Sequence, residues 1–261
     1  MKTQPKTPLI ATALLMGVLF LSGCYETTQT TSGADYLANY SNTPTGASRS
    51  VDAEVMEVAA IEPNLRFPAR IGIAKIFRGE LINLSETEAT AWQAAREDLG
   101  DGFGEFVPVS PLIAELVYTA PEKSSKLSTK EVVRKIRLAA ARQHLDVVLI
   151  YEVFSQSSEQ TLSSSIAYWT IIGAYFVPGE KVETVGYANA LLLDVRNGYP
   201  YGTAAGSSTM EDVNTLVGSY DKRRQLEERS QIAASLNLIP EAVEMFQTLK
   251  EKRTQATAAK N

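Results

Sequence analysis

The sequence predicts a mixed α/β domain, in which a β-α-β-α-β half is followed by an antiparallel meander and by C-terminal helices packed on the same sheet. Three observations support this fold class. Two capping boxes begin helical patterns that lie between strand patterns. Residues 146–153 form a near-continuous apolar run, which is typical of a central strand covered on both faces. An Asn-Gly pair at 197–198 marks a tight hairpin turn.

The first half of the domain alternates strand and helix patterns, which favours an α/β layer structure. Residues 69–77 alternate in the β sense. A capping box at 85–88 begins a helix that stops at the glycine-rich segment 100–104. Residues 106–109 form a short strand pattern, and Pro108 favours a position at the edge of the sheet because proline has no N–H to donate.

The second capping box, at 128–131, begins a helix that ends near His144, just before the apolar run. Because that run lacks polar alternation, we expect Val148 and Leu149 both to be buried.

The second half changes character to antiparallel strands. Residues 166–177 are aromatic and β-branched, 187–195 form another strand pattern, and 199–207 return after the Asn-Gly turn. These strands extend the same sheet. The mixed domain is therefore expected to occupy residues 51–208.

The C-terminal part is predicted to be helical over 209–253. One helix covers about 211–235, and Pro240 lies at a first-turn position that begins a second one. The last residues, 254–261, are typical of a disordered tail.

The N-terminus has the pattern of an export signal. Two lysines precede an uncharged apolar run over 9–21, which is shorter than the ~20 residues that a membrane-spanning helix needs. The run ends in Leu-Ser-Gly-Cys, a lipobox that predicts cleavage between Gly23 and Cys24 and lipidation of Cys24. Residues 1–23 are then a lipoprotein signal peptide, and the polar segment 24–50 is a flexible tether.

Cys24 is the only cysteine, so an exported chain has no intramolecular disulfide to form, and lipidation accounts for the residue. Tyr25 follows it, and the absence of Asp there favours the inner leaflet of the outer membrane, with the domain facing the periplasm. The formal net charge is −5, and cleavage removes two lysines. An acidic domain is a poor candidate for binding nucleic acid.

The sequence has no recognisable set of catalytic or metal-binding residues. His144 is the only histidine, and its place near a helix C-terminus is explained by the helix dipole. One histidine and a lipidated cysteine supply neither a nucleophile–base pair nor a zinc site. The acidic residues of the first helix form no distinct pair: Glu86, Glu88, Glu97 and Asp98. We therefore predict no catalytic residues, no metal, no cofactor and no enzymatic activity.

The segment 166–181 is unusually aromatic. It has two interpretations, a buried strand with a Pro-Gly turn or an exposed apolar surface that contacts a membrane or a protein partner. The second makes it the candidate interaction surface, carried by Tyr168, Trp169, Tyr175, Phe176, Pro178 and Gly179.

The lipobox, the Asp35-Tyr36-Leu37 element and above all the block at 168–181 resemble the rhombotarget lipoproteins of bacteria. That resemblance implies a rhomboid-type processing signal at the C-terminus, but residues 257–261 carry no glycine pair or basic stop. The order of elements is also similar to the α/β domain of the curli-secretion channel lipoprotein and to the N-terminal domain of the Tol-system propeller protein, a likeness of fold that does not give function.

The leading functional hypothesis is a non-enzymatic envelope lipoprotein that binds a protein partner as an assembly accessory. Its partners would be a membrane, through the N-terminal lipid, an envelope protein and, as a homo-oligomer, a second copy of the chain. One alternative is a carboxylate enzyme or a small-ligand receptor, which a deep pocket with convergent Asp, Glu or Arg would favour. Another is an oligomeric secretion pore with 162–190 as a membrane-inserting hairpin.

Overall fold

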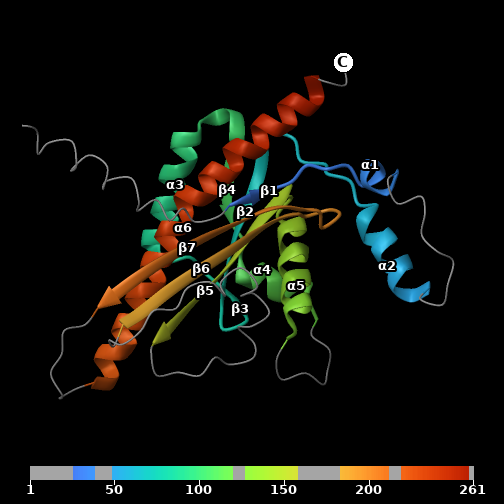
Figure 1. Ribbon diagram of the computed structural model, residues 1–261. Coiled ribbons are helices and arrows are strands. Elements are labelled where there is room, and N and C mark those ends of the chain that lie inside the picture. Colours follow the sequence, from blue (N-terminus) through green and yellow to red (C-terminus); the bar gives the residue numbers. More distant parts are fainter. Residues whose placement is uncertain (1–25, 39–48, 120–126, 158–182, 212–218, 259–261) are drawn as a thin grey trace, which may run out of the picture.

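The computed structural model describes residues 26–38, 49–119, 127–157, 183–211 and 219–258 (Figure 1). The elements in chain order are β1 (Thr27–Thr28), α1 (Gly33–Ala38), α2 (Arg49–Ala59), β2 (Ala69–Phe77), β3 (Glu80–Ile82), α3 (Glu86–Leu99), a 3₁₀ turn (Asp101–Phe103), β4 (Gly104–Pro108), α4 (Pro111–Val117), α5 (Thr129–Arg142), β5 (Val147–Ser157), β6 (Glu183–Asp194), β7 (Pro200–Glu211) and α6 (Ser219–Ala258).

The strands of the described residues form one seven-stranded mixed sheet in the order β1-β7-β6-β5-β2-β3, with β4 beside the first half of β2. Strand β2 is parallel to β4 and β5, and the other neighbours are antiparallel. The predicted fold class is confirmed, a mixed α/β sheet with C-terminal helical structure packed on it. Pro108 lies at the end of β4, which pairs with β2 alone among the described strands.

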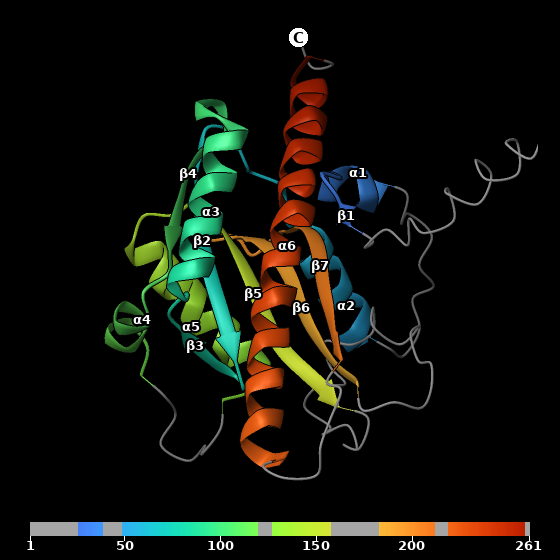
Figure 2. The same ribbon diagram turned by 90° about the vertical axis from the view of Figure 1, so that its left-hand side faces the viewer.

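Helices cover both faces of the sheet, with α3 and α6 on one side and α4 and α5 on the other (Figure 2). Strand β5 alternates between the two cores. Leu149 and Tyr151 pack toward α3 and α6, whereas Val148 and Ile150 pack toward α5. Val148 and Leu149 both have an exposed fraction of 0%, which confirms their predicted burial.

Both predicted capping boxes are present, and they fix the starts of α3 and α5. Ser85 and Ser128 accept from the backbone N–H of Glu88 and Glu131, whose carboxylates accept in return from the cap residues. A further helix, α4, was not predicted, although Ser110 caps it and Pro111 occupies its first turn. At seven residues it is too short for a clear apolar period.

One continuous helix, α6, replaces the two helices that the sequence predicts, and Pro240 lies inside it. Packing explains why the helix does not break there. Leu238 and Ala242 on either side of Pro240 are both fully buried against the sheet. At Gly206 a Cβ atom would collide with the backbone of α6, so the helix lies directly on β7. Burial along the whole contact outweighs the hydrogen bond that proline removes.

The N-terminal segment is more ordered than its composition predicts. The sequence predicts a flexible tether over residues 24–50, but β1 and α1 lie within this range. Strand β1 pairs with the outer edge of β7, and the N–H of Gln29 donates to the carbonyl of Tyr201 at 2.8 Å. Edge pairing uses backbone groups, so a segment rich in Thr and Ser joins a sheet without apolar side chains. None of the helices in the described residues has the length and apolarity to cross a membrane.

Candidate functional site: a basic groove beside α5

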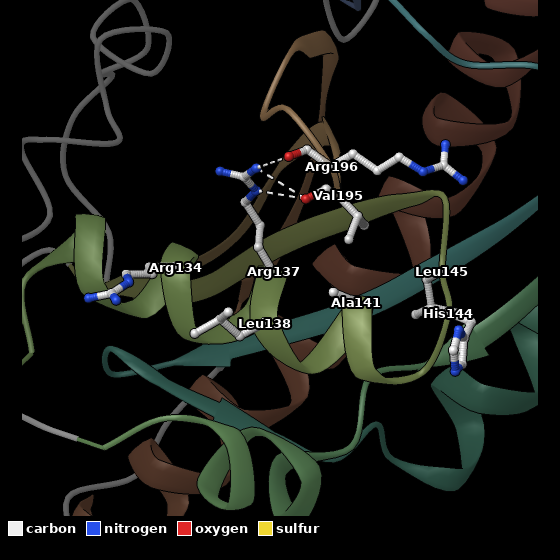
Figure 3. A pocket seen from close by; sticks show the side chains of 8 residues that line it. All are labelled: Arg134, Arg137, Leu138, Ala141, His144, Leu145, Val195 and Arg196. Carbon is white, nitrogen blue, oxygen red and sulfur yellow. Dashed lines mark hydrogen bonds between the residues drawn. The ribbon is translucent and has the colours of Figure 1, made fainter.

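A groove with a volume of about 510 Å³ lies between α5 and the turn that joins β6 to β7 (Figure 3). Its lining residues come from α5, from the segment that follows it and from the turn: Arg134, Arg137, Leu138, Ala141, His144, Leu145, Val195 and Arg196.

The floor of the groove is apolar. Leu145 and Val195 are buried and belong to the smaller of the two cores, whereas Leu138 is 38% exposed and Ala141 is exposed. Positions 134, 138 and 141 follow a spacing of three or four residues, which places them on one face of α5. The helix therefore presents a stripe that begins with an arginine and continues with apolar side chains.

Arg137 fastens α5 to the turn. Its Nε and Nη2 atoms donate to the carbonyl of Val195 at 3.3 and 3.1 Å, and Nη2 also donates to the carbonyl of Arg196 at 3.2 Å (Figure 3). Gly198 in the same turn has φ of 78°, a conformation that favours glycine. A Cβ atom there would also press on the Arg137 guanidinium. The arginine thus has a structural role in addition to its charge.

The turn itself is held by a buried carboxylate. Asp194 is 1% exposed and accepts from the N–H groups of Arg196 and Asn197 at 2.8 and 3.3 Å. Its other oxygen accepts from the hydroxyl of Tyr201 at 3.0 Å, and that hydroxyl accepts in turn from the N–H of Leu65 at 2.6 Å. Burial, and then the Asp194 carboxylate, raise the pKa of Tyr201, which keeps the hydroxyl protonated as a donor.

The remaining polar side chains of the groove are more accessible. Arg196 pairs with Asp146 at 2.7 Å, and both side chains are partly in solvent, so the pair contributes little to stability. Arg134 and His144 are exposed and lie at opposite ends of the groove (Figure 3). None of the residues that line the groove is a carboxylate, although the whole chain is acidic. The groove is therefore a local concentration of hydrogen-bond donors with positive charge.

The site residues predicted from the sequence lie outside the described residues, so their predicted roles stay predictions: Gly23, Cys24, Tyr168, Trp169, Tyr175, Phe176, Pro178 and Gly179. His144 is described, and it lies just past the end of α5 with φ of 57°. Its side chain is exposed at the groove. The sequence pattern does not mark the arginines of the groove as a site, although it shows the spacing of Arg134 and Arg137 on one helix.

The one carboxylate of α3 that is buried serves the core. Glu88 is 0% exposed, and Lys75 Nζ donates to its two oxygens at 2.7 and 2.8 Å. Burial raises the pKa of Glu88, but hydrogen bonds from Lys75 and Ser85 outweigh this and hold it below the ordinary value. Tyr151 adds a hydrogen bond at 3.3 Å. Among the described residues, no group of three or more His, Cys, Asp or Glu side chains is arranged to hold a metal ion.

No protein-family model and no curated protein matches the chain. Solved structures give weak likenesses. A PelC dodecamer from Paraburkholderia phytofirmans has a TM-score of 0.29 and 15% identity, over 66% of this chain and 86% of that one. The lipoprotein GNA1162 from Neisseria meningitidis has a TM-score of 0.30 and 17% identity, over 64% and 99%. A HAM1 protein from Coxiella burnetii has a TM-score of 0.34 and 12% identity, over 72% and 99%. Likenesses at this level assign no family or function.

Proposed function

We propose that the chain is a lipid-anchored, non-enzymatic accessory of the cell envelope that binds an acidic segment of a partner protein in the groove beside α5. The observation that carries the proposal is the composition of the groove, an apolar floor between cationic side chains with no carboxylate in its lining. Guanidinium groups match the geometry of carboxylates and bind them in pairs of hydrogen bonds.

The shape of the groove favours a peptide segment over a small molecule. Small-ligand sites bury most of their ligand, whereas the floor residue Leu138 is 38% exposed and Ala141 is open to solvent. Arg134 and Ala141 are separated by about 10 Å along the helix axis. That length suits about three residues of an extended segment. A partner with two acidic side chains around an apolar one would satisfy both the charges and the floor.

The envelope location in this proposal comes from the sequence. A lipid at Cys24 would hold the domain at the inner leaflet of the outer membrane, facing the periplasm. A membrane-held protein and its partner share a thin layer of solvent, so a modest affinity for an acidic segment is enough for association.

Photo-crosslinking in intact envelopes tests the proposal. A photoreactive amino acid at Leu138, in the floor of the groove, should capture a protein through a peptide that contains Asp or Glu. The capture should fall sharply in Arg134→Gln combined with Arg196→Gln, which removes two positive charges and leaves Arg137 on the turn. The same probe at Leu112, an exposed residue of α4, should give a pattern that these substitutions do not change.

Capture that is insensitive to the two arginine substitutions, or captured peptides without acidic residues, would rule out binding of this chemistry. If the captured acidic peptide comes from the chain itself, the partner is a second copy, and the accessory acts as a homo-oligomer.

A second candidate function is a receptor for a small anion, because the volume of the groove lies within the usual range of small-molecule sites. Calorimetry of the purified domain with citrate and with inorganic phosphate separates the two. Saturable binding that Arg134→Gln abolishes would support the receptor. Absence of heat together with arginine-dependent crosslinking would support the peptide site.

A membrane-inserting hairpin over 162–190 would need the last part of that segment to leave the sheet. Residues 183–190 belong to β6, and Ala188 and Ala190 are buried in the core beneath α6. The packing of β6 therefore favours the accessory over the pore.

A further inference from the structure

The segment directly after the predicted lipidation site is built into the sheet. We infer that the edge of the sheet formed by β1 and β7 is the surface that faces the membrane, with the domain held against the lipid headgroups. This inference rests on the lipid anchor of the proposed function. It adds an orientation and a second contact surface, whose occupant is the bilayer that carries the anchor.

The backbone of β1 is paired to β7. Thr27 lies opposite Thr203, and Thr28 lies opposite Gly202. Because Gly202 has no side chain, the backbone of β1 lies close against it, and a Cβ atom there would collide with the carbonyl of Thr27. Gln29 continues the attachment, since its N–H donates to Tyr201 and its side-chain amide donates to the carbonyl of Pro200 at 2.6 Å.

The other side of β1 is attached to α6. Lys252 Nζ donates to the carbonyl and the hydroxyl of Thr28 at 3.2 and 2.6 Å. The Thr248 hydroxyl donates to a carboxylate oxygen of Glu26 at 3.4 Å. The segment is therefore fixed both to the last long strand of the sheet and to the C-terminal helix, whose inner face is buried in the core.

This attachment limits how far the domain is able to move from the lipid. Two peptide units separate Cys24 from Glu26, so their Cα atoms lie at most ~7 Å apart. A freely flexible segment over the whole range 24–50 would instead allow a root-mean-square separation of roughly 30 Å. The shorter distance brings the β1–β7 edge to the headgroups and excludes a domain that samples the periplasm at the end of a long tether.

The opposite edge of the sheet, at β3, then points away from the bilayer. The path from β1 to β3 crosses five strand spacings, which amounts to about 24 Å. The basic groove lies beside α5, on the face of the sheet that α6 does not cover. A partner would therefore reach the groove from this face of the sheet and not through the edge that β1 forms.

Fluorescence quenching in proteoliposomes tests this orientation. The natural cysteine carries the lipid, so one engineered cysteine takes one fluorophore. The two positions are Ser207→Cys on β7 and Glu80→Cys on β3, both at exposed residues. Vesicles of phosphatidylethanolamine and phosphatidylglycerol with a nitroxide in the headgroup should remove most of the fluorescence at Ser207→Cys and little of it at Glu80→Cys. Equal quenching at the two positions, or stronger quenching at Glu80→Cys, would overturn the inference.

A matched variant tests the cause of the orientation. A long Gly/Ser linker inserted between Tyr25 and Glu26 keeps β1 in the sheet but frees the domain from the lipid. Quenching at Ser207→Cys should then fall to the level at Glu80→Cys, and a difference that persists would overturn the role of the short connection. Failure of the protein to float with the vesicles, with no acyl mass at Cys24, would instead refute the lipid anchor of the proposed function.

Discussion

The face of the sheet under α3 and α6 encloses charged and aromatic side chains, whereas the face under α4 and α5 encloses mostly aliphatic ones. On the first face, Lys75 and Glu88 form a buried ion pair beside Trp92, whose ring meets that of Phe106 edge to face at 5.6 Å. On the second face, the charged groups stay at the boundary with solvent, along the basic groove. The buried ion pair under α3 and α6 thus contributes to the packing of the core, whereas the charged side chains of the groove beside α5 are accessible to a ligand.

The largest effect is expected where a charge enters the aliphatic core. Val148→Asp places a carboxylate without a partner among fully buried side chains. The cost is several kcal/mol, enough to abolish cooperative folding. Thermal unfolding followed by circular dichroism measures it, with Val148→Ala as the control for lost volume. A cooperative transition near that of the parent would show that the two faces differ less than their packing indicates.

The ion pair gives the matching test on the other face. Glu88→Ala leaves Lys75 buried and unpaired, so the free energy of unfolding should fall by about 3–5 kcal/mol. Glu86→Ala is the control, because Glu86 lies in the same helical turn but is exposed. Urea denaturation of both variants gives the comparison. Equal stability of the two would mean that Lys75 finds other partners.

Close contact between α6 and β7 gives a third test. Gly206→Ala introduces a Cβ atom against the backbone of α6 at Ala234 and Leu238, so we expect a loss of about 1–3 kcal/mol. The neighbouring substitution Ser207→Ala, at an exposed position, should change stability little. If urea denaturation shows the same midpoint for both variants, α6 moves away from the sheet at little cost.

A smaller effect separates the two roles of arginine in the groove. Arg137→Ala removes hydrogen bonds from a charged donor to two carbonyls of the turn and should cost about 1–3 kcal/mol. Arg134→Ala should be nearly neutral for stability and should weaken partner capture instead. Urea unfolding and crosslinking on both variants test this division. It fails if the Arg134 variant is the less stable of the two.

The smallest effect is a dependence on pH. The folded pKa of Glu88 is below its ordinary value of 4.5. The stability that this carboxylate contributes is therefore fully present above pH 4.5 and is lost as the pH falls through the lowered folded value. The free energy of unfolding of the parent should fall between neutral and acid pH. In Glu88→Gln it should fall less over the same range. If the free energy of unfolding depends on pH in the same way in the two proteins, other titrating groups cause the loss of stability in acid.

Local signals in the sequence predicted the first half of the fold. The capping boxes at Ser85 and Ser128 and the apolar run with Val148 and Leu149 act within a few residues, and each is present as predicted. The predicted break between two helices at Pro240 is wrong, because burial of α6 against the distant strand β7 keeps the helix continuous. The attachment of β1 was missed for a related reason, since an edge strand of threonines leaves no apolar pattern to read.

The groove was harder to predict than the fold. Arg134, Arg137 and His144 follow one another along α5 and the segment after it, but Arg196 comes from a hairpin turn far along the chain. Only the folded sheet brings them to one place, with Asp194 fixing the turn from inside. The spacing of Arg134 and Arg137 on one helix is visible in the sequence, but no sequence pattern links these two residues to Arg196.

The contacts of β1 join the two ends of the described chain. Thr28 is held by Lys252, a residue 224 positions further along the sequence. Contacts of such separation form late, because the loop they close is costly in entropy. A chain truncated before Lys252 would lack this contact to the strand that follows Cys24. Attachment of β1 to α6 is therefore complete only after the last helix has packed on the sheet.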